Sequence, residues 1–257
     1  MKLRIKFTKS GPVRFIGHLD VMRFFQKAIR RAGIDVAYTG GFSPHQIMTF
    51  AAPLGVGLES EGEYMDIEVN SIRSCGDVKD RLNEAGVPGI RVVSVKILPE
   101  KAGNAMASVA AASYLVRFRQ GREPSANPGE LLPDFLSREH IPYKKETKKG
   151  TRELDLRPGI YRLTWDGSAF SMLLNASSAG NIKPAQVIEA LFALRGESLQ
   201  ENALLITRKE LYADTGTPEE IRLVSLDEIG RTQKSVLSDA SKNASHSSLT
   251  TAKFPIE

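Results

Sequence analysis

Apolar positions in the first hundred residues follow two different periods. Leu3, Ile5 and Phe7 alternate with basic residues, which is typical of a strand with one buried face. From Asp20, the expected N-cap, apolar side chains recur every three to four residues as far as Gly33, and this indicates an amphipathic helix. The pattern further predicts strands at 47–51, 65–69 and 93–97, and a helix from a cap at Ser71 or Ser74 to Gly86.

The resulting order, β-α-β-β-α-β, predicts a ferredoxin-like domain. Right-handed crossovers then place both helices on one face of the sheet and make the first and third strands antiparallel neighbours. In that arrangement the basic residues of the first strand face acidic residues of the third across the open face of the sheet. The residues concerned are Lys2, Arg4 and Lys6 on one strand and Asp66 and Glu68 on the other.

The second half of the chain repeats this order of elements with little identity of side chains. Asp166-Gly167 is typical of a two-residue hairpin turn, and Pro184 opens a helix at its favoured first position. Strands are expected at 114–118, from Tyr143 onward, and at 160–165, 170–174 and 204–207, with helices at 131–137 and from Pro184 to Gly196.

We therefore expect an α+β fold with two tandem ferredoxin-like (βαββαβ) domains and a flexible C-terminal tail. The first domain covers residues 1–100 and a linker of small and polar residues covers 101–110. The second domain covers 111–212, and 213–257 is an extension. From Thr232 the composition turns to serine, threonine, alanine and asparagine, which is typical of a flexible tail.

Composition narrows the class of protein. Of 257 residues, 41% are hydrophobic and 25% are charged, which is the balance of a globular chain and excludes wholesale disorder. Cys75 is the one cysteine, so intrachain disulfides and an iron-sulfur cluster held by this chain alone are excluded. No apolar signal region opens the sequence, and glycine, proline and polar residues interrupt its longest uncharged stretch, 36–58. We expect a cytoplasmic protein with no membrane segment and no cofactor of its own.

The net charge of +5 is spread unevenly. Residues 1–50 contain nine lysines and arginines against two aspartates, a net of +7, whereas 56–90 contain three basic and eight acidic residues, a net of −5. We expect these two segments to lie against each other.

The first helix carries basic residues at i, i+4, i+7 and i+8 with no acid to pair with them. One interpretation is a solvated helix face on which lysine and arginine happen to dominate. The other is a surface that contacts phosphates. The candidate nucleic-acid-binding residues are Arg14, Arg23, Lys27, Arg30, Arg31 and Phe42, with the basic cluster Lys144, Lys145, Lys148 and Lys149 at a predicted hairpin tip.

Two histidines lie in loops beside the basic helix. One interpretation makes His18 a residue that packs or hydrogen-bonds at a helix start. The other makes His18 and His45 a general acid-base pair for metal-independent cleavage of RNA. The acidic series at 59–68 alternates along a strand, which turns part of it toward the basic first strand, so no metal site is predicted.

Three motifs carry a resemblance to a known family. They are RFIGHLD at 14–20, GGFSPH at 40–45 and PLGVGLESEGEYMD at 53–66. Together they resemble DUF2344, a bacterial family of radical-SAM-associated proteins, closely over residues 1–100 and more loosely to about 210. The resemblance implies a radical SAM protein as partner and an RNA or ribosomal substrate, and it carries over no catalytic residue. Since the Cys-x₃-Cys-x₂-Cys of a radical SAM enzyme is absent, radical chemistry would belong to another chain.

Three hypotheses for the function follow. The first is a non-catalytic RNA-binding or adaptor protein that works with a separate radical SAM enzyme in RNA or ribosome modification. The second is a metal-independent endoribonuclease using His18 and His45, in line with a looser architectural resemblance to the CRISPR repeat-cleaving endonucleases. The third is a protein-protein module whose basic helix docks on a radical SAM partner.

Overall fold

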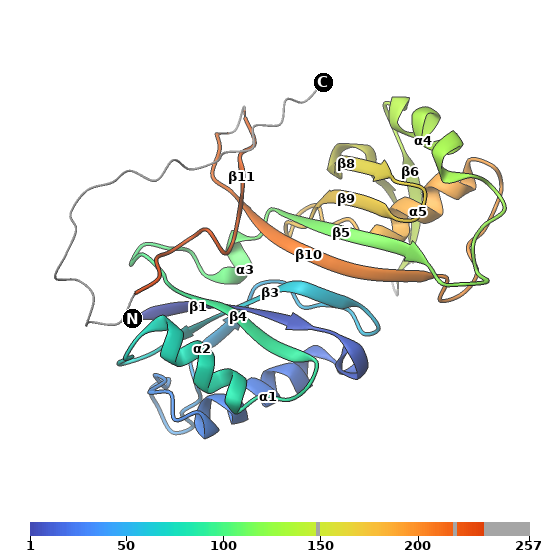
Figure 1. Ribbon diagram of the computed structural model, residues 1–257. Coiled ribbons are helices and arrows are strands. Elements are labelled where there is room, and N and C mark those ends of the chain that lie inside the picture. The colour runs from blue at the N-terminus through green and yellow to red at the C-terminus, as the bar shows by residue number, and fades with distance from the viewer. Residues whose placement is uncertain (148–149, 218–219, 234–257) are drawn as a thin grey trace. The chain divides into compact units, whose positions relative to one another are not determined.

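The structure is a computed structural model that describes residues 1–147, 150–217 and 220–233. The chain has an α+β fold and divides into two compact units (Figure 1). Unit 1 contains Met1–Val109 and the segment from Glu210 onward, and unit 2 contains Ala110–Lys209. Within the described part of the chain, no helix is long and apolar enough to cross a membrane.

Unit 1 is built on an antiparallel sheet with two helices on one face (Figure 1). The order of its strands is β4-β1-β3, and β2 pairs with β3. The predicted pairing of the first and third strands is confirmed, with Leu3 opposite Ile67 and Ile5 opposite Met65. The elements are β1 (Lys2–Lys9), α1 (His18–Arg31), β2 (Met48–Phe50), β3 (Glu59–Glu68), α2 (Cys75–Glu84) and β4 (Ile90–Ile97).

The core of unit 1 lies between this sheet and the two helices. The alternating residues Leu3, Ile5 and Phe7 are buried there, as their pattern predicts. Phe7 packs edge-on against Phe25 of α1, with ring centroids 4.6 Å apart, and against Phe50 of β2 at 6.2 Å. Burial of each such side chain contributes about 1.5–3 kcal/mol, so this face of β1 fixes the position of α1.

Three residues were predicted to begin or end the helices of unit 1, and two of these predictions are confirmed. Ser74 caps α2, since its hydroxyl accepts a hydrogen bond from the Asp77 amide at 3.0 Å, and Gly33 follows α1 with a positive φ of 58°. The prediction of Asp20 as the N-cap is wrong, because Gly17 holds that position and α1 begins at His18. Asp20 lies in the first turn, where a carboxylate is favoured by the helix dipole.

The second face of the unit 1 sheet is covered. The short helix α3 (Ala105–Ser108), within the stretch expected to be a linker, contacts β2 and β3. The segment from Glu210 contains the end of β10 (Leu204–Asp214) and β11 (Leu223–Ser225). Residues 213–217 and 220–233, expected as an extension, thus belong to unit 1, and residues 234–257 of the predicted tail lie outside the described residues.

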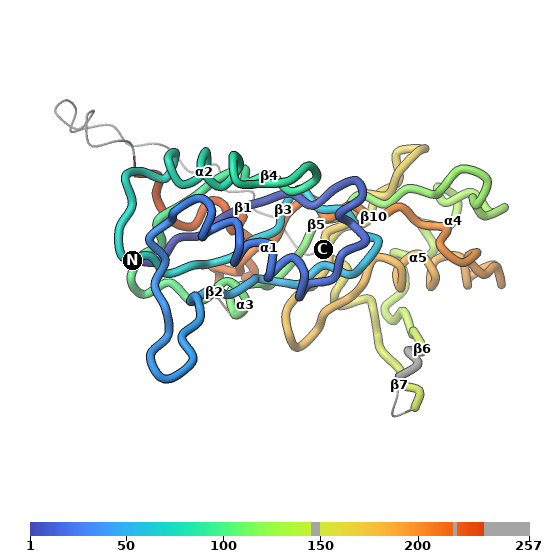
Figure 2. Tube along the Cα trace, turned by 90° about the horizontal axis from the view of Figure 1, so that it is seen from below, coloured from blue at the N-terminus to red at the C-terminus, as the bar shows by residue number. Residues whose placement is uncertain are grey.

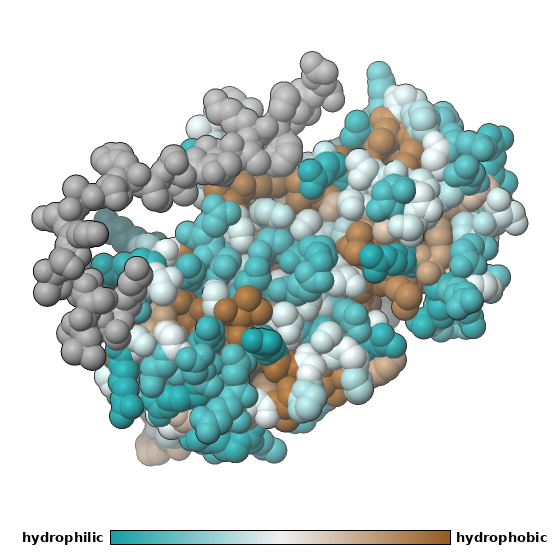
Figure 3. Space-filling view, in the orientation of Figure 1, coloured by the Kyte–Doolittle hydropathy of each residue, from teal (hydrophilic) through white to brown (hydrophobic). Residues whose placement is uncertain are grey.

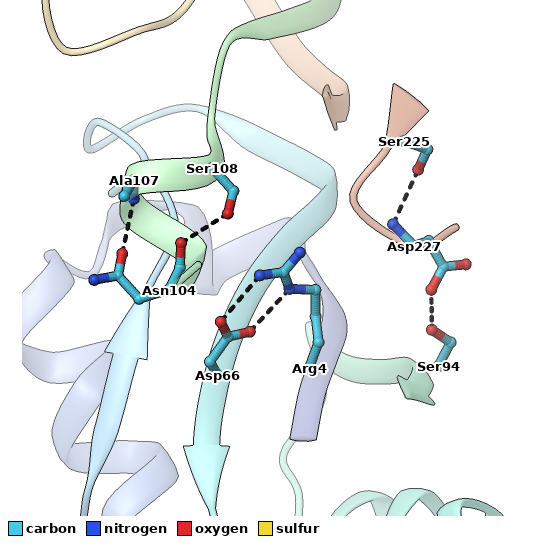
Figure 4. A network of polar contacts seen from close by, with 8 residues as sticks. All are labelled: Arg4, Asp66, Ser94, Asn104, Ala107, Ser108, Ser225 and Asp227. Carbon is cyan, nitrogen blue, oxygen red and sulfur yellow. Dashed lines mark hydrogen bonds and ion pairs between the residues drawn. The ribbon is translucent and has the colours of Figure 1, made fainter. Parts of the chain in front are cut away.

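Charged residues of β1 form ion pairs on this second, covered face of the sheet. Arg4 and Asp66 form the expected pair, but they are buried, at 1% and 3% exposure, and do not lie on an open face (Figure 4). Lys6 instead contacts Glu210, with Nζ 2.7 Å from Oε2. The expectation of an open face is wrong because the chain returns to unit 1 after unit 2.

The strands of unit 2 follow the order β10-β5-β9-β8. The Asp166-Gly167 turn is a four-residue loop rather than a two-residue one, because Trp165 pairs with Phe170. The strand expected from Tyr143 belongs to a separate two-stranded hairpin. The elements are β5 (Ala111–Phe118), α4 (Pro128–Ser137), β6 (Pro142–Thr147), β7 (Gly150–Asp155), β8 (Ile160–Trp165), β9 (Phe170–Asn175) and α5 (Pro184–Ala193).

Candidate functional site

The basic residues of the first helix lie together on its solvent side. Arg23, Lys27, Arg30 and Arg31 are all exposed, whereas Val21, Phe25, Ala28 and Ile29 of the same helix are buried. We call these four cations the ridge. In the space-filling view, hydrophilic residues gather over the region that α1 and α2 occupy in Figure 1 (Figure 3).

One carboxylate lies beside the ridge. Arg23 contacts Asp20 of the preceding turn, with Nη1 3.4 Å from Oδ1, and both side chains are mostly exposed. The expectation of a helix face with no acid to pair with is therefore wrong at Arg23. An exposed pair of this kind contributes about 0–1 kcal/mol and is screened by salt, so it leaves the arginine available to a phosphate.

The remaining ridge cations have backbone partners or none. Arg30 Nε donates to the Gln26 carbonyl at 3.3 Å, and Arg31 Nη2 donates to the Ala85 carbonyl at 2.8 Å. Lys27 has no partner among residues 1–147, 150–217 and 220–233. None of these contacts neutralises the positive charge, so the electrostatic potential at the ridge stays positive.

Arg14 lies outside the ridge, in the 3₁₀ helix η1 (Gly11–Phe15). Its guanidinium contacts Glu59 at 3.2 Å and lies over the ring of Phe15 at 4.8 Å. Its carbonyl accepts hydrogen bonds from Gly57 N and, more weakly, from Lys9 Nζ. The prediction of Arg14 as a nucleic-acid ligand remains a prediction, but in this structure the residue joins the first motif to the third.

The loop between α1 and β2 holds the second motif. Figure 2 shows this segment projecting as a narrow hairpin away from the other elements of unit 1. Phe42 is fully exposed at its tip, and Tyr38 at its base is half exposed. We call residues 38–46 the finger loop.

Hydrogen bonds close the base of the finger loop. Tyr38 and Gln46 form an antiparallel bridge, and Thr39 N donates to the His45 carbonyl at 2.9 Å. The Thr39 hydroxyl accepts from the His45 amide at 3.1 Å and lies 3.1 Å from His45 Nδ1. His45 is thus engaged in shaping the loop.

A small pocket lies where the first and third motifs meet. Its wall includes the half-buried ring of His18, which stands edge-on to Phe50 with centroids 5.0 Å apart. Lys9 is buried there, and its ammonium donates to the Ile16 carbonyl at 2.8 Å. The residues that line the pocket are Phe7, Lys9, His18, Val21, Phe50, Pro53, Leu54 and Glu63.

The two histidines are not joined. No hydrogen bond or ring contact links His18 to His45 in the part of the chain that the structure describes, and the pocket contains His18 alone. The packing of His18 against Phe50 agrees with the structural interpretation of this residue.

The second basic cluster lies in unit 2, on the β6-β7 hairpin. Lys144 is exposed on β6 and Lys145 follows it on the same strand. Lys148 and Lys149 lie outside the described residues. The hairpin is anchored at its base by Asp155, which accepts hydrogen bonds from His140 Nδ1 at 2.8 Å and Ile141 N at 2.9 Å. The hydrogen bond to Asp155 and the charge of that carboxylate raise the pKa of His140.

Sequence reasoning missed two residues that organise the site. Lys9 ends a strand and is in phase with the buried residues Leu3, Ile5 and Phe7, so the alternation places it on the buried face. Sequence reasoning passed over this signal because a lysine is rarely buried. Gln46 is buried and donates from Nε2 to the Gln26 carbonyl of α1 at 3.1 Å. A glutamine next to an exposed motif gives no sign that it contacts a helix twenty residues earlier.

Comparison with known proteins identifies the family. Residues 2–184 match the family described as "Uncharacterized protein conserved in bacteria (DUF2344)", and the chain belongs to this family. No curated protein matches the sequence. Among solved structures the chain is similar to one in "Crystal Structure of a Cbf5-Nop10-Gar1 Complex", with a TM-score of 0.45 and 7% identity, over 81% of this chain and 48% of that one. The chain thus spans about half the length of that structure's chain, and a similarity at this level carries no argument.

Proposed function

We propose that this DUF2344 protein binds RNA through the ridge and the finger loop, as a non-catalytic adaptor for a separate radical SAM enzyme. The observation that carries the proposal is the ridge itself, where four exposed cations share one helix with a single exposed carboxylate beside them. Support for the radical SAM partner comes from the resemblance of the three motifs alone.

An anionic polymer suits this surface better than a small anion. The ridge positions extend over two turns of α1, from Arg23 to Arg31, so several cations can contact successive phosphates along one strand. Exposed aromatic rings on the finger loop add a group that binds bases, which a small anion would not need.

We also propose that each unit is a ferredoxin-like domain. The strand order β4-β1-β3-β2 in unit 1 and the order β10-β5-β9-β8 in unit 2 support this, since each fits a fourth-first-third-second arrangement of strands. In unit 2 the β6-β7 hairpin is then an insertion between the first helix and the second strand.

The salt dependence of RNA binding tests the main proposal. We expect the combined variant Arg23→Gln, Lys27→Gln and Arg30→Gln to weaken binding of a single-stranded RNA roughly a hundredfold near 0.1 M salt. The slope of log K against log salt should fall by about 2, because three cations each release close to 0.7 counterion. Fluorescence anisotropy at several salt concentrations measures both quantities.

A matched control removes the same charge elsewhere in unit 1. Arg73, Arg91 and Lys101 are also exposed, and they lie outside the ridge and the finger loop. Their replacement by glutamine should leave affinity and slope close to those of the unchanged protein. Equal losses in both variants, or the absence of salt-dependent binding, would refute RNA binding by the ridge. Copurification of a radical SAM protein in the presence of nuclease would then favour the protein-protein module.

The endoribonuclease remains a second candidate because His18 lines a pocket together with Lys9 and Glu63. The imidazole of His18 is a group that can take a proton from a ribose hydroxyl, and a lysine and a glutamate line the same pocket. Cleavage of RNA in EDTA that is lost in His18→Ala and retained in His45→Ala would support this function at the pocket. Cleavage that survives His18→Ala would exclude it.

A further inference from the structure

The finger loop holds an aromatic ring in solvent on a backbone that is fixed by its own hydrogen bonds. Three bonds between Thr39 and His45 close the loop, and the Ile47 amide donates to the Ala37 carbonyl at 3.0 Å just below them. Gly41 has a φ of 98°, a conformation that glycine adopts without strain, immediately before Phe42. The backbone at the base of the loop is therefore already ordered and has less conformational entropy to lose on binding.

The same loop is hydrogen-bonded to α1, the helix that carries the ridge, at a single backbone carbonyl. The Gln26 carbonyl accepts a hydrogen bond from Gln46 Nε2 at 3.1 Å and another from Arg30 Nε at 3.3 Å. Gln46 is the last residue of the finger loop and is buried, at 5% exposure. The base of the loop and the ridge cation Arg30 are thus held at one place on α1.

We propose that the ligand of this composite surface is single-stranded RNA, with an unpaired base stacked on Phe42 and its phosphates along the ridge. This rests on the proposed function and adds the class of substrate. In a duplex both faces of each base are covered by neighbouring pairs, so an exposed ring finds a partner only where a base is unstacked. Stacking on an aromatic side chain accepts any base, which predicts a preference for strandedness rather than for sequence.

A tryptophan at the loop tip reports stacking directly. The chain has one tryptophan, Trp165 in unit 2, so Phe42→Trp combined with Trp165→Phe places the only indole on the finger loop. Three RNA probes are then titrated: a single-stranded adenylate oligomer of about ten nucleotides, an abasic oligomer of the same length, and a duplex. The indole fluorescence should fall with the adenylate strand and stay constant with the other two, although all three carry phosphates.

Affinity measurements separate this inference from the proposed function. Phe42→Ala should weaken binding of the adenylate strand about 5- to 100-fold and leave the salt slope unchanged, because it removes a stacking contact and no charge. Phe15→Ala, which removes another exposed ring of unit 1, is the control and should have little effect. The ridge variant should lower the slope and keep the quenching at saturating RNA.

The possible results separate base stacking on Phe42 from RNA binding by the ridge. An affinity of Phe42→Ala for the adenylate strand equal to that of the unchanged protein, or quenching that the abasic or duplex RNA produces equally, would overturn the stacking while leaving RNA binding by the ridge intact. Loss of the adenylate preference in Phe42→Ala alone would support it. An indole signal that responds to none of the RNAs, with salt-dependent binding retained, would overturn the assignment of Phe42 as a base-stacking residue.

Discussion

Arg4 on β1 donates two hydrogen bonds to Asp66 on β3, from Nε at 2.9 Å and from Nη2 at 3.0 Å. Both side chains are buried, and Nη1 of Arg4 has no partner among the described residues. Figure 4 places this pair between α3 and the segment that holds Ser225 and Asp227. The alternating charges predict a pair on the sheet surface, but in the structure the ion pair is buried. Burial increases the loss in the free energy of unfolding that follows when one partner is removed.

Removing one partner of this pair should strongly destabilise unit 1. Asp66→Asn leaves a buried guanidinium without its counter-charge, and we expect a loss of about 3–5 kcal/mol in the free energy of unfolding. The double variant Arg4→Met with Asp66→Leu removes both charges and should recover most of that loss, because no buried charge remains. Urea denaturation of the three proteins measures the difference. A double variant no more stable than Asp66→Asn would contradict this account.

Tyr64 and Glu210 should make stability fall at high pH. Burial, and then the charge of Glu210, raise the pKa of the Tyr64 phenol above its usual value, and its hydroxyl donates to Glu210 Oε1 at 2.5 Å. The unfolded phenol loses its proton near pH 10, while the folded one keeps it, so the unfolded state is favoured as pH rises above about 10. Tyr64→Phe removes this linkage.

The measurement is the free energy of unfolding as a function of pH. Tyr64→Phe should be less stable near neutral pH by about 1.5–3 kcal/mol, the value of a hydrogen bond to a charged group. Above pH 10 the unchanged protein should lose up to roughly 1.4 kcal/mol per pH unit more than the variant. Parallel curves for the two proteins would show that the phenol ionises equally in both states.

Gly89 should be far less tolerant of a side chain than Gly57. Both have a positive φ, 92° and 89°, so alanine is strained at either position. A Cβ at Gly89 would also lie 2.6 Å from the Ser10 carbonyl oxygen and 2.7 Å from Val13 Cγ2, whereas nothing lies within 4 Å at Gly57. We expect Gly57→Ala to cost about 1–2 kcal/mol and Gly89→Ala clearly more. Thermal unfolding compares the two variants. Equal losses of stability would mean that the backbone near Ser10 moves to make room for the added Cβ.

The Thr39 hydroxyl should matter for RNA binding and little for stability. Thr39→Ala removes both contacts of this hydroxyl with His45 and keeps the backbone bond from Thr39 N. The finger loop is then less ordered before it binds, and affinity for single-stranded RNA should fall several-fold because more entropy is lost on binding. Thr39→Ser keeps the hydroxyl and should bind as the unchanged protein does. Weaker binding by Thr39→Ser than by Thr39→Ala would contradict a role for the hydroxyl.

The local pattern was a good guide wherever one face of an element is buried in its own unit. The alternation of Leu3, Ile5 and Phe7, the stop at Gly33 and the cap at Ser74 each depend on residues a few positions apart, and all three predictions are confirmed. The N-cap prediction for Asp20 was wrong because η1 and Gly17 set the start of α1, and an acid fits both the cap and the first turn.

For the candidate site, the sequence located the ridge and the exposed Phe42 but not what connects them. The shared carbonyl of Gln26 depends on Gln46 crossing from the loop to the helix. The hydrogen-bond partner of the buried Lys9 is likewise a carbonyl in the segment that follows its own strand. Contacts of this kind have no period in the sequence, so pattern analysis does not detect them.

The sequence by itself determined the periods, the order of the elements in unit 1 and the sign of the charge on each segment, because these follow from neighbouring residues. Only the tertiary structure decided that the chain returns from Glu210 to cover the second face of the first sheet, and that Arg4 and Asp66 are buried there. The physical reason is that burial is a property of the whole chain: a charge pattern specifies which residues attract one another, and the packing around them sets the dielectric in which they do so.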